Sequence, residues 1–250
     1  MILFISDTHC AYHLINEQIE YAQEELAIPV SCVIHLGDFG IFRPQLYDFF
    51  IRKNGSFLKP VYFIEGNHED FDAFDSLMKK YNNVYFTYLS RSVVTEIEGY
   101  KFLSLGGSAY MDAMTTPTAS VIKDHHIDDC LEIHSEGVDI IITHDCPQGI
   151  GVPNSPGLEV YGQTGFARGD ELARHFSPKL WIFGHHHKWF ELEKGNTRYL
   201  GLSGSRRGFA LLGENYECMI INHHIPFKKP SFLSKALTFL RILRPNGPSH

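Results

Sequence analysis

The sequence predicts an α/β fold built on a largely parallel sheet, from the order of its elements and from its composition. Residues 1–80 alternate short apolar runs with amphipathic segments, which is the βαβα order of a parallel sheet covered by helices. The chain has 250 residues, of which 44% are apolar and 20% charged, a composition that excludes a largely disordered chain. A chain of this length can bury one sizeable core.

Strands and helices alternate through the first half of the chain. Pro29 and Pro60 mark breaks between expected elements in this half, and each precedes an apolar run. We expect, in chain order, a strand at 1–6, a helix at 14–26, a strand at 31–36, a helix at 44–52, a strand at 61–65 and a helix at 71–80.

The second half mixes short strands with further helices. Turns are expected at Glu98-Gly99, at 194–196 and at 213–215. The expected elements are strands at 84–86, 92–97 and 100–105, a helix at 118–134, a strand at 138–143, a helix at 168–176, a strand at 180–183 and antiparallel strands within 188–221. The sequence contains no internal repeat and no long linker, so residues 1–225 are expected to form one domain.

Residues 226–250 form a tail of different composition. The tail is basic and lacks acidic residues, and apolar side chains recur at helical spacing through 231–243. The pattern predicts an amphipathic helix that docks on the domain, on a second copy of the chain, or on an anionic membrane or partner.

Charge and cysteine content limit the class of protein. The net charge of −7 argues against a protein that coats nucleic acid, because such proteins usually carry a basic excess. The five cysteines form no CxxC pair, and their odd number argues against a disulfide framework. The opening MILFISD lacks the basic start of a signal peptide, and no run of 18 apolar residues could span a membrane. We therefore expect a cytoplasmic protein.

Side chains that bind metals follow five of the expected strands. The chain contains 15 histidines, and histidine is the commonest metal ligand. One Asp-x-His after a strand is more often a helix cap beside a surface histidine. Five such sites at the carboxyl edge of a sheet, where open α/β folds bind ligands, indicate a metal site. The sites are Asp7-Thr8-His9, Gly37-Asp38, Gly66-Asn67-His68-Glu69, His144-Asp145 and Gly184-His185-His186-His187.

The expected ligands combine oxygen and nitrogen donors without a thiolate. Such a set suits manganese, iron or zinc in preference to a structural cysteine–zinc site. His185 and His187 are two residues apart, so in an extended segment both would project to one side and His186 would point away. The expected ligands are Asp7, His9, Asp38, Asn67, His144, His185 and His187.

A paired metal centre made of such ligands predicts a reaction. A carboxylate can bridge two cations through its two oxygens. Cations about 3.5–4 Å apart can clamp the attacking and leaving oxygens of an in-line displacement, and they lower the pKa of a shared water enough to give hydroxide near neutral pH. The predicted reaction is hydrolysis of a phosphate ester by attack of that hydroxide.

The order DTH, GD, GNHE, H and GHHH resembles the five motifs of the calcineurin-like metallophosphoesterases, from residue 7 to residue 187. The resemblance implies a four-layer αββα sandwich, with two facing mixed sheets flanked by helices. It implies that two divalent cations share Asp38. One would be held by Asp7, His9, Asp38 and His187, and the other by Asp38, Asn67, His144 and His185. The catalytic residues implied are Asp38 and His68, a histidine that binds no metal and stabilises the transition state or protonates the leaving group.

Departures from the family pattern narrow the substrate class. The protein serine/threonine phosphatases of this superfamily carry G-D-x-V-D-R-G, whereas this chain has GDFGIFR, with Ile41 and Phe42 in place of the aspartate and the arginine. The stretches ISDTH, HLGDF and PKLWIFGHHHK are similar to a branch that includes phosphodiesterases acting on cyclic nucleotides. We therefore expect a phosphodiester substrate, with a phosphomonoesterase or protein phosphatase as the alternative.

Three further interpretations concern a scaffold role, an arginine pair and Glu69. A metallophosphoesterase fold can serve as a scaffold for another protein, although the complete ligand set argues against this here. Arg206 and Arg207 could hold a phosphate oxygen, or they could be an ordinary surface pair. Glu69 is expected to be a charge at a helix N-terminus and not a ligand.

Overall fold

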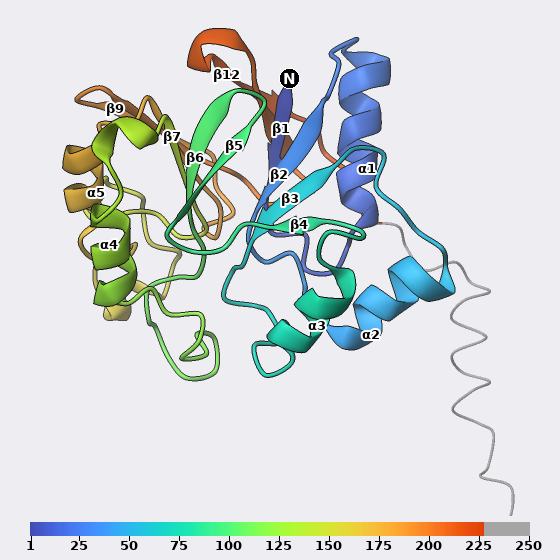
Figure 1. The fold of residues 1–250 in the computed structure, drawn as a ribbon, viewed down its shortest axis with the longest axis horizontal. Coiled ribbons are helices and arrows are strands. Elements are labelled where there is room, and N and C mark those ends of the chain that lie inside the picture. Colours follow the sequence, from blue (N-terminus) through green and yellow to red (C-terminus); the bar gives the residue numbers. More distant parts are fainter. Residues whose placement is uncertain (228–250) are drawn as a thin grey trace, which may run out of the picture.

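The computed structural model describes residues 1–227, which form two facing six-stranded sheets with helices on both outer sides (Figure 1). Each sheet contains parallel and antiparallel pairs, so the expected sandwich of two mixed sheets flanked by helices is confirmed. No helix in residues 1–227 is long and apolar enough to cross a membrane. The tail helix expected at 231–243 lies outside the described residues.

The first sheet has the strand order β12-β11-β1-β2-β3-β4. Its strands are β1 (Ile2–Ile5), β2 (Cys32–Leu36), β3 (Val61–Ile64), β4 (Thr87–Tyr88), β11 (Gly208–Leu212) and β12 (Cys218–Asn222). Strands β1 to β4 run parallel, and β11 pairs antiparallel with both β1 and β12. The loops that follow β1, β2 and β3 therefore leave the same edge of the sheet.

The second sheet has the order β5-β6-β7-β8-β10-β9. Its strands are β5 (Val93–Ile97), β6 (Tyr100–Leu105), β7 (Ile140–Thr143), β8 (Leu180–Phe183), β9 (Phe190–Lys194) and β10 (Thr197–Gly201). Strands β6, β7, β8 and β10 run parallel, and the outer strands β5 and β9 are antiparallel to their neighbours.

Helices cover the outer face of each sheet (Figure 1). The helices are α1 (His13–Glu20), α2 (Arg43–Leu46), α3 (Phe74–Tyr81), α4 (Asp124–Leu131) and α5 (Gly169–Phe176). The first two continue into the π-helical turns Tyr21–Glu25 and Tyr47–Arg52. In Figure 1, α1, α2 and α3 accompany the first sheet, and α4 and α5 accompany the second.

Alternating side chains of the strands supply three separate hydrophobic cores. Leu3 and Ile5 of β1 pack toward the α1–α3 side, whereas Ile2 and Phe4 pack between the two sheets. A third core joins the second sheet to α4 and α5, with Trp181 of β8 at its centre. Because the central strands are buried on both faces, their sequences are continuous apolar runs without alternation.

Two of the expected secondary-structure elements differ clearly from the structure. Residues 84–86 do not form a strand, because Asn83 has a positive φ of 59° and its N–H bonds to the Phe86 carbonyl in a turn, so that β4 begins at Thr87. The helix expected at 118–134 begins only at Asp124, because the backbone around Ser120 pairs with Ser108 at the end of the second sheet's β6.

Candidate metal centre

The loops after β1, β2, β3, β7 and β8 bring all the expected ligands to one place between the two sheets. Several ligands have left-handed backbone geometry, which a residue with a side chain rarely adopts. Their φ angles are 57° for Asp7, 44° for His9, 54° for Asp38, 64° for His185 and 53° for His187. These sharp turns at the strand ends are what point the side chains toward one another.

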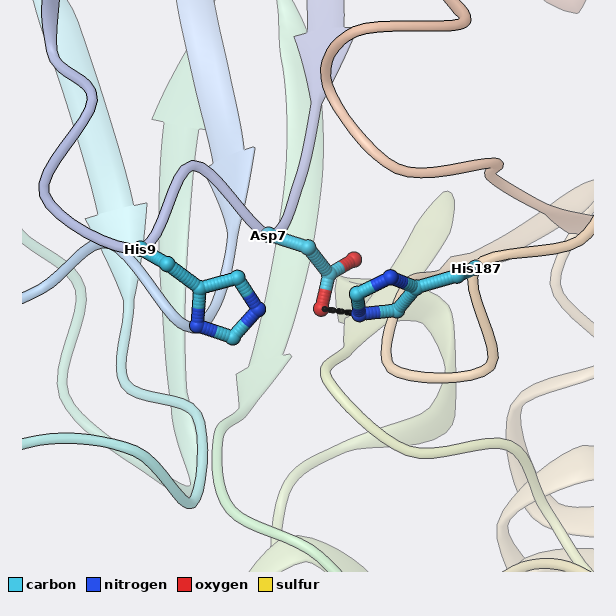
Figure 2. A group of neighbouring side chains, drawn as sticks. All are labelled: Asp7, His9 and His187. Atoms are coloured by element: carbon cyan, nitrogen blue, oxygen red, sulfur yellow. Dashed lines mark ion pairs between the residues drawn. The ribbon is translucent and has the colours of Figure 1, made fainter.

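One group of ligands, which we call the Asp7 cluster, consists of Asp7, His9 and His187 (Figure 2). Their ligand atoms lie within 4.8 Å of one another. Asp7 is buried, whereas the two histidines are exposed. The His187 Nε2 atom lies 3.2 Å from Asp7 Oδ1, but the contact lacks hydrogen-bond geometry, so this buried oxygen has no hydrogen-bond partner within the described residues.

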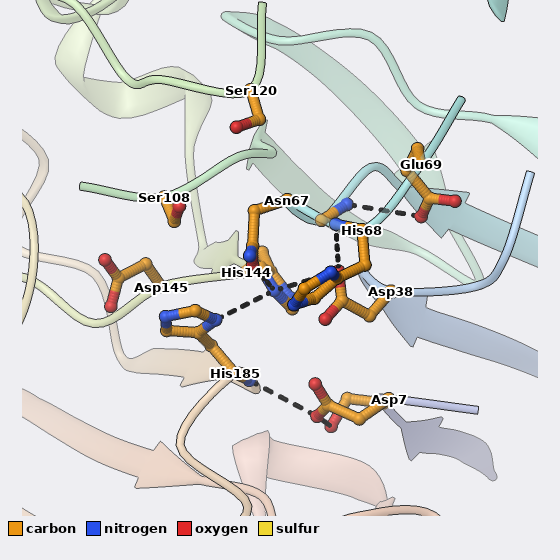
Figure 3. Close-up of polar contacts among 12 residues, drawn as sticks. Asp7, Asp38, Asn67, His68, Glu69, Ser108, Ser120, His144, Asp145 and His185 are labelled. Carbon is orange, nitrogen blue, oxygen red and sulfur yellow. Dashed lines mark hydrogen bonds and ion pairs between the residues drawn. The ribbon is translucent and has the colours of Figure 1, made fainter. Parts of the chain in front are cut away.

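The second group, which we call the His144 cluster, consists of Asp38, His144 and His185 (Figure 3). His144 Nδ1 lies 2.7 Å from the Leu36 carbonyl, so it carries the proton and donates it there. When His144 is neutral, its Nε2 atom therefore presents a lone pair. Three polar atoms surround Nε2: Asn67 Oδ1 at 3.1 Å, His185 Nδ1 at 3.2 Å and Asp38 Oδ1 at 3.4 Å.

Asp38 lies between the two clusters. Its Oδ1 atom lies in the His144 cluster, and its Oδ2 atom is 3.8 Å from His9 Nε2 of the Asp7 cluster. Burial would raise the pKa of Asp38, but the nearby His144 and the N–H of His68 hold it well below its usual range. Burial would likewise lower the pKa of His144, but Asp38 and Asp7 raise it to about 10. Both shifts have the same cause, which is the attraction between the buried carboxylates and a positive charge on His144.

This donor set fits divalent cations. Acceptor atoms that face one another without a donor need either a proton, which His144 can hold, or a cation. The amide of Asn67 presents an acceptor in either case, because its Nδ2 donates to the Thr115 carbonyl at 2.7 Å and leaves Oδ1 facing the cluster. Carboxylate, amide oxygen and imidazole without thiolate suit manganese, iron or zinc.

Comparison with known proteins agrees with this geometry. The family model described as calcineurin-like phosphoesterase matches residues 1–189. The chain belongs to the calcineurin-like phosphoesterase family. Divalent metal cofactors and a phosphoester substrate follow from the family and from the two clusters.

Solved structures resemble the chain in fold. The phosphopantetheinyl hydrolase from Mycobacterium tuberculosis is 13% identical with a TM-score of 0.52, and the match covers 82% of this chain and 90% of that one. GAP50, described as the anchor in the inner membrane complex of Plasmodium, is 11% identical with a TM-score of 0.52, and the match covers 99% and 97%. No curated protein matches the sequence.

Glu69 stabilises the ligand-bearing loops of this phosphoesterase. Its buried carboxylate accepts N–H groups from the loop after β2, at Phe39, Gly40 and Ile41, and from Gly66 in the loop after β3. The helix that follows begins only at Phe74, so the expected role of Glu69 as a helix-terminal charge is wrong. The sequence signal was the position of Glu69 next to the ligand motif, but the partners in the loop after β2 lie 28–30 residues away.

His186 pairs with Asp145 and belongs to neither of the two clusters, although its ring meets the His185 ring edge-on at 4.9 Å. Its Nε2 atom lies 2.9 Å from Asp145 Oδ1, and Asp145 also accepts the N–H groups of Ala109 and Cys146. Asp145 therefore connects the loops after β6, β7 and β8, a role that the sequence reasoning missed. The assumption of an extended segment at 185–187 is wrong, because the left-handed φ angles send His185 and His187 into different clusters.

Two cavities open beside the ligands. On the His144 side, a cavity of about 230 Å³ is lined by Asn67, His68, His185 and the loops 109–115 and 154–165. On the Asp7 side, a cavity of about 520 Å³ is lined by the Asp7 cluster, by residues 204–207 and by Phe227. The ligand clusters thus lie between two separate spaces.

Proposed function

We propose that the protein is a dinuclear metal-dependent phosphodiesterase. The observation that carries this proposal is the placement of two ligand clusters, joined by Asp38, between two cavities. One cation would be held by Asp7, His9, Asp38 and His187. The other would be held by Asp38, Asn67, His144 and His185.

Protein side chains supply orientation and proton transfer in this proposal. Manganese, iron or zinc ions bound at the clusters would supply Lewis acidity and a water of lowered pKa. The backbone N–H of His68 donates to Asp38 Oδ1 at 2.8 Å, which fixes His68 beside the shared ligand (Figure 3). Its exposed imidazole lines the 230 Å³ cavity, where it would give a proton to the departing oxygen.

The two cavities favour a diester over a monoester. A phosphodiester carries two organic substituents, and each cavity would take one of them. Ile41 also argues against a protein phosphatase of the G-D-x-V-D-R-G type, because this position is fully buried in an apolar core and provides no carboxylate for His68.

The experiment compares hydrolysis of bis-p-nitrophenyl phosphate and p-nitrophenyl phosphate in the presence of manganese. We expect faster turnover of the diester. This turnover should be lost in Asp38→Asn, because a neutral amide cannot replace a carboxylate anion that bridges two cations. Bound metal is measured in parallel by mass spectrometry. Faster turnover of the monoester would contradict the diester preference, and full activity of a metal-free Asp38→Asn protein would contradict the mechanism.

A scaffold role is the second candidate, because a protein described as an anchor has a similar fold. The same experiment separates the two functions. A protein that retains two metals and hydrolyses neither substrate would support the scaffold. Deletion of residues 226–250 would then test whether the tail serves self-association or partner docking.

A further inference from the structure

Arg206 and Arg207 form a positively charged wall of the cavity on the Asp7 side. Asp7 is the only acidic residue among the described residues that line this cavity, and the expected cation would bind to its carboxylate. The whole chain has a net charge of −7, so the positive charge of this wall is a local feature. Because this wall lies beside the metal ligands, it can contact a substrate that is bound at the metal centre.

Residues 204–207, which we call the arginine loop, are fixed to the metal centre by buried hydrogen bonds. The Ser205 hydroxyl donates to the Asp7 carbonyl at 3.1 Å. The Ser205 carbonyl in turn accepts from Nε2 of Gln18 at 2.8 Å, and Gln18 is fully buried. The other amide atom of Gln18, Oε1, lies 2.8 Å from His223 Nδ1. These contacts hold the loop in place before a ligand arrives, which lowers the entropy that binding must overcome.

The arginine loop is a neighbour of the ligand His187, since Gly204 and His187 line the same cavity. A Cβ atom added at Gly204 would be in van der Waals contact with His187, 3.4 Å from its Nδ1 atom. An anion held by the arginines would therefore be a close neighbour of a phosphate bound at the Asp7 cluster.

Neither arginine pairs with a carboxylate among the described residues. The guanidinium of Arg206 lies 4.3 Å from the centre of the Phe227 ring, and its Nη1 atom is 3.4 Å from the Pro226 carbonyl. Stacking on a ring leaves the edge of a guanidinium able to donate. Arg207 is exposed. Unpaired guanidinium groups beside a metal centre are suited to bind phosphate or carboxylate.

The opposite cavity has different chemistry. Its described lining contains no lysine or arginine; it contains Tyr110, Tyr161 and the amides of Asn154 and Gln163. Tyr161 donates to Asp112 at 3.1 Å, so a carboxylate also lies close to this side. A negatively charged substituent would therefore prefer the arginine loop.

We propose that the arginine loop binds a second anionic group of the substrate. The substrate class is a phosphodiester with two unlike arms, of which the arm on the Asp7 side carries a phosphate or carboxylate and the arm on the His68 side is uncharged. This proposal rests on the proposed function, because the first phosphate is the one that the metal centre hydrolyses.

The test uses two diesters with the same leaving group, methyl p-nitrophenyl phosphate and 2-carboxyethyl p-nitrophenyl phosphate. In the manganese-loaded wild type we expect the KM of the carboxylate-bearing diester to be lower by about 10-fold to 100-fold, the range for hydrogen bonds to a charged group. In Arg206→Gln/Arg207→Gln the ratio of the two KM values should fall to about one. Arg174→Gln, which removes an exposed, ion-paired charge on α5, should keep the wild-type ratio.

The outcomes distinguish failure of the anion subsite from failure of the phosphodiesterase. Equal KM values in the wild type, or a ratio unchanged in the double variant, would overturn the anion subsite while leaving the phosphodiesterase intact. Manganese-dependent turnover of neither diester would overturn the phosphodiesterase and the subsite together. If the double variant does not fold, Arg207→Gln replaces it, because that side chain is exposed, and it should lower the ratio by about 10-fold. Raising the ionic strength to about 0.5 M should shrink the wild-type ratio, since screening weakens exposed charge pairs.

Discussion

Replacing Glu69 by glutamine tests whether this buried carboxylate stabilises the ligand-bearing loops. The carboxylate accepts two N–H groups at each oxygen: Phe39 and Gly66 at Oε1, and Gly40 and Ile41 at Oε2. Glutamine is nearly the same shape, but its amide nitrogen would face two of those N–H groups and accept from neither. The variant therefore leaves two buried donors without an acceptor.

The magnitude follows from those two donors. Burial raises the pKa of Glu69 to about 8, so the comparison is made above that pH, where the group is a carboxylate. Each buried unsatisfied N–H costs about 1–3 kcal/mol, so Glu69→Gln should then lose about 2–6 kcal/mol. This is a large share of the free energy of unfolding of a typical domain, about 5–15 kcal/mol. If the loops relax to relieve the donors, the loss appears instead as weaker metal binding, because the loop after β2 carries Asp38.

The assay is equilibrium denaturant unfolding together with manganese titration. The control is Glu171→Gln, which breaks a partly exposed pair with Arg168 and should leave the free energy of unfolding close to that of the wild type. A Glu69→Gln protein with a free energy of unfolding within 1 kcal/mol of the wild type, and with unchanged manganese affinity, would refute the reasoning.

Three further changes have calculable outcomes. In Gly66→Ala the new Cβ would overlap the Asp38 carboxylate and backbone nitrogen, so kcat should fall about 100-fold, whereas Gly137→Ala, which meets nothing closer than 4.0 Å, should keep it. Burial lowers the pKa of His126 to about 4 from 6.5, so the unfolded chain binds the extra proton between these values and stability falls as the pH drops through that window. Denaturant midpoints measured across it should fall less in His126→Gln; an equal fall would contradict this. Excess manganese at about 100 times its Kd should add about 2.7 kcal/mol per site to the free energy of unfolding, and a chelator should remove it; an unchanged midpoint would contradict a folded-state metal site.

The sequence predicts the features that depend on residues close together in the chain. A parallel strand that is buried on both faces is apolar throughout, and the ligands follow such apolar runs. The end of each run therefore predicts both the end of a strand and the position of a ligand. His144 and Asp38 were placed at the sheet edge for this reason, and the structure has their side chains 3.4 Å apart.

Contacts between distant segments could not be predicted in this way. Glu69 has a motif position, but its partners are backbone N–H groups that carry no sequence signal. Arg206 and Arg207 lie beside Asp7 because β11 pairs with β1, across about two hundred residues of chain. Single-sequence patterns identify β11 as a strand but do not give its neighbour.

The left-handed backbone at the ligands has a consequence for how such a site is dissected. Alanine at Asp7, Asp38 or His187 would keep an L side chain in a conformation that costs about 1–2 kcal/mol per residue, while removing the group whose binding offsets it. The loss of stability measured in an alanine scan would therefore combine two effects, the missing metal ligand and a backbone strain that is no longer offset. Glycine at the same positions removes the ligand and relieves the strain, so a glycine variant that is more stable than the alanine variant, despite the greater entropy of glycine in the unfolded chain, would reveal the backbone strain.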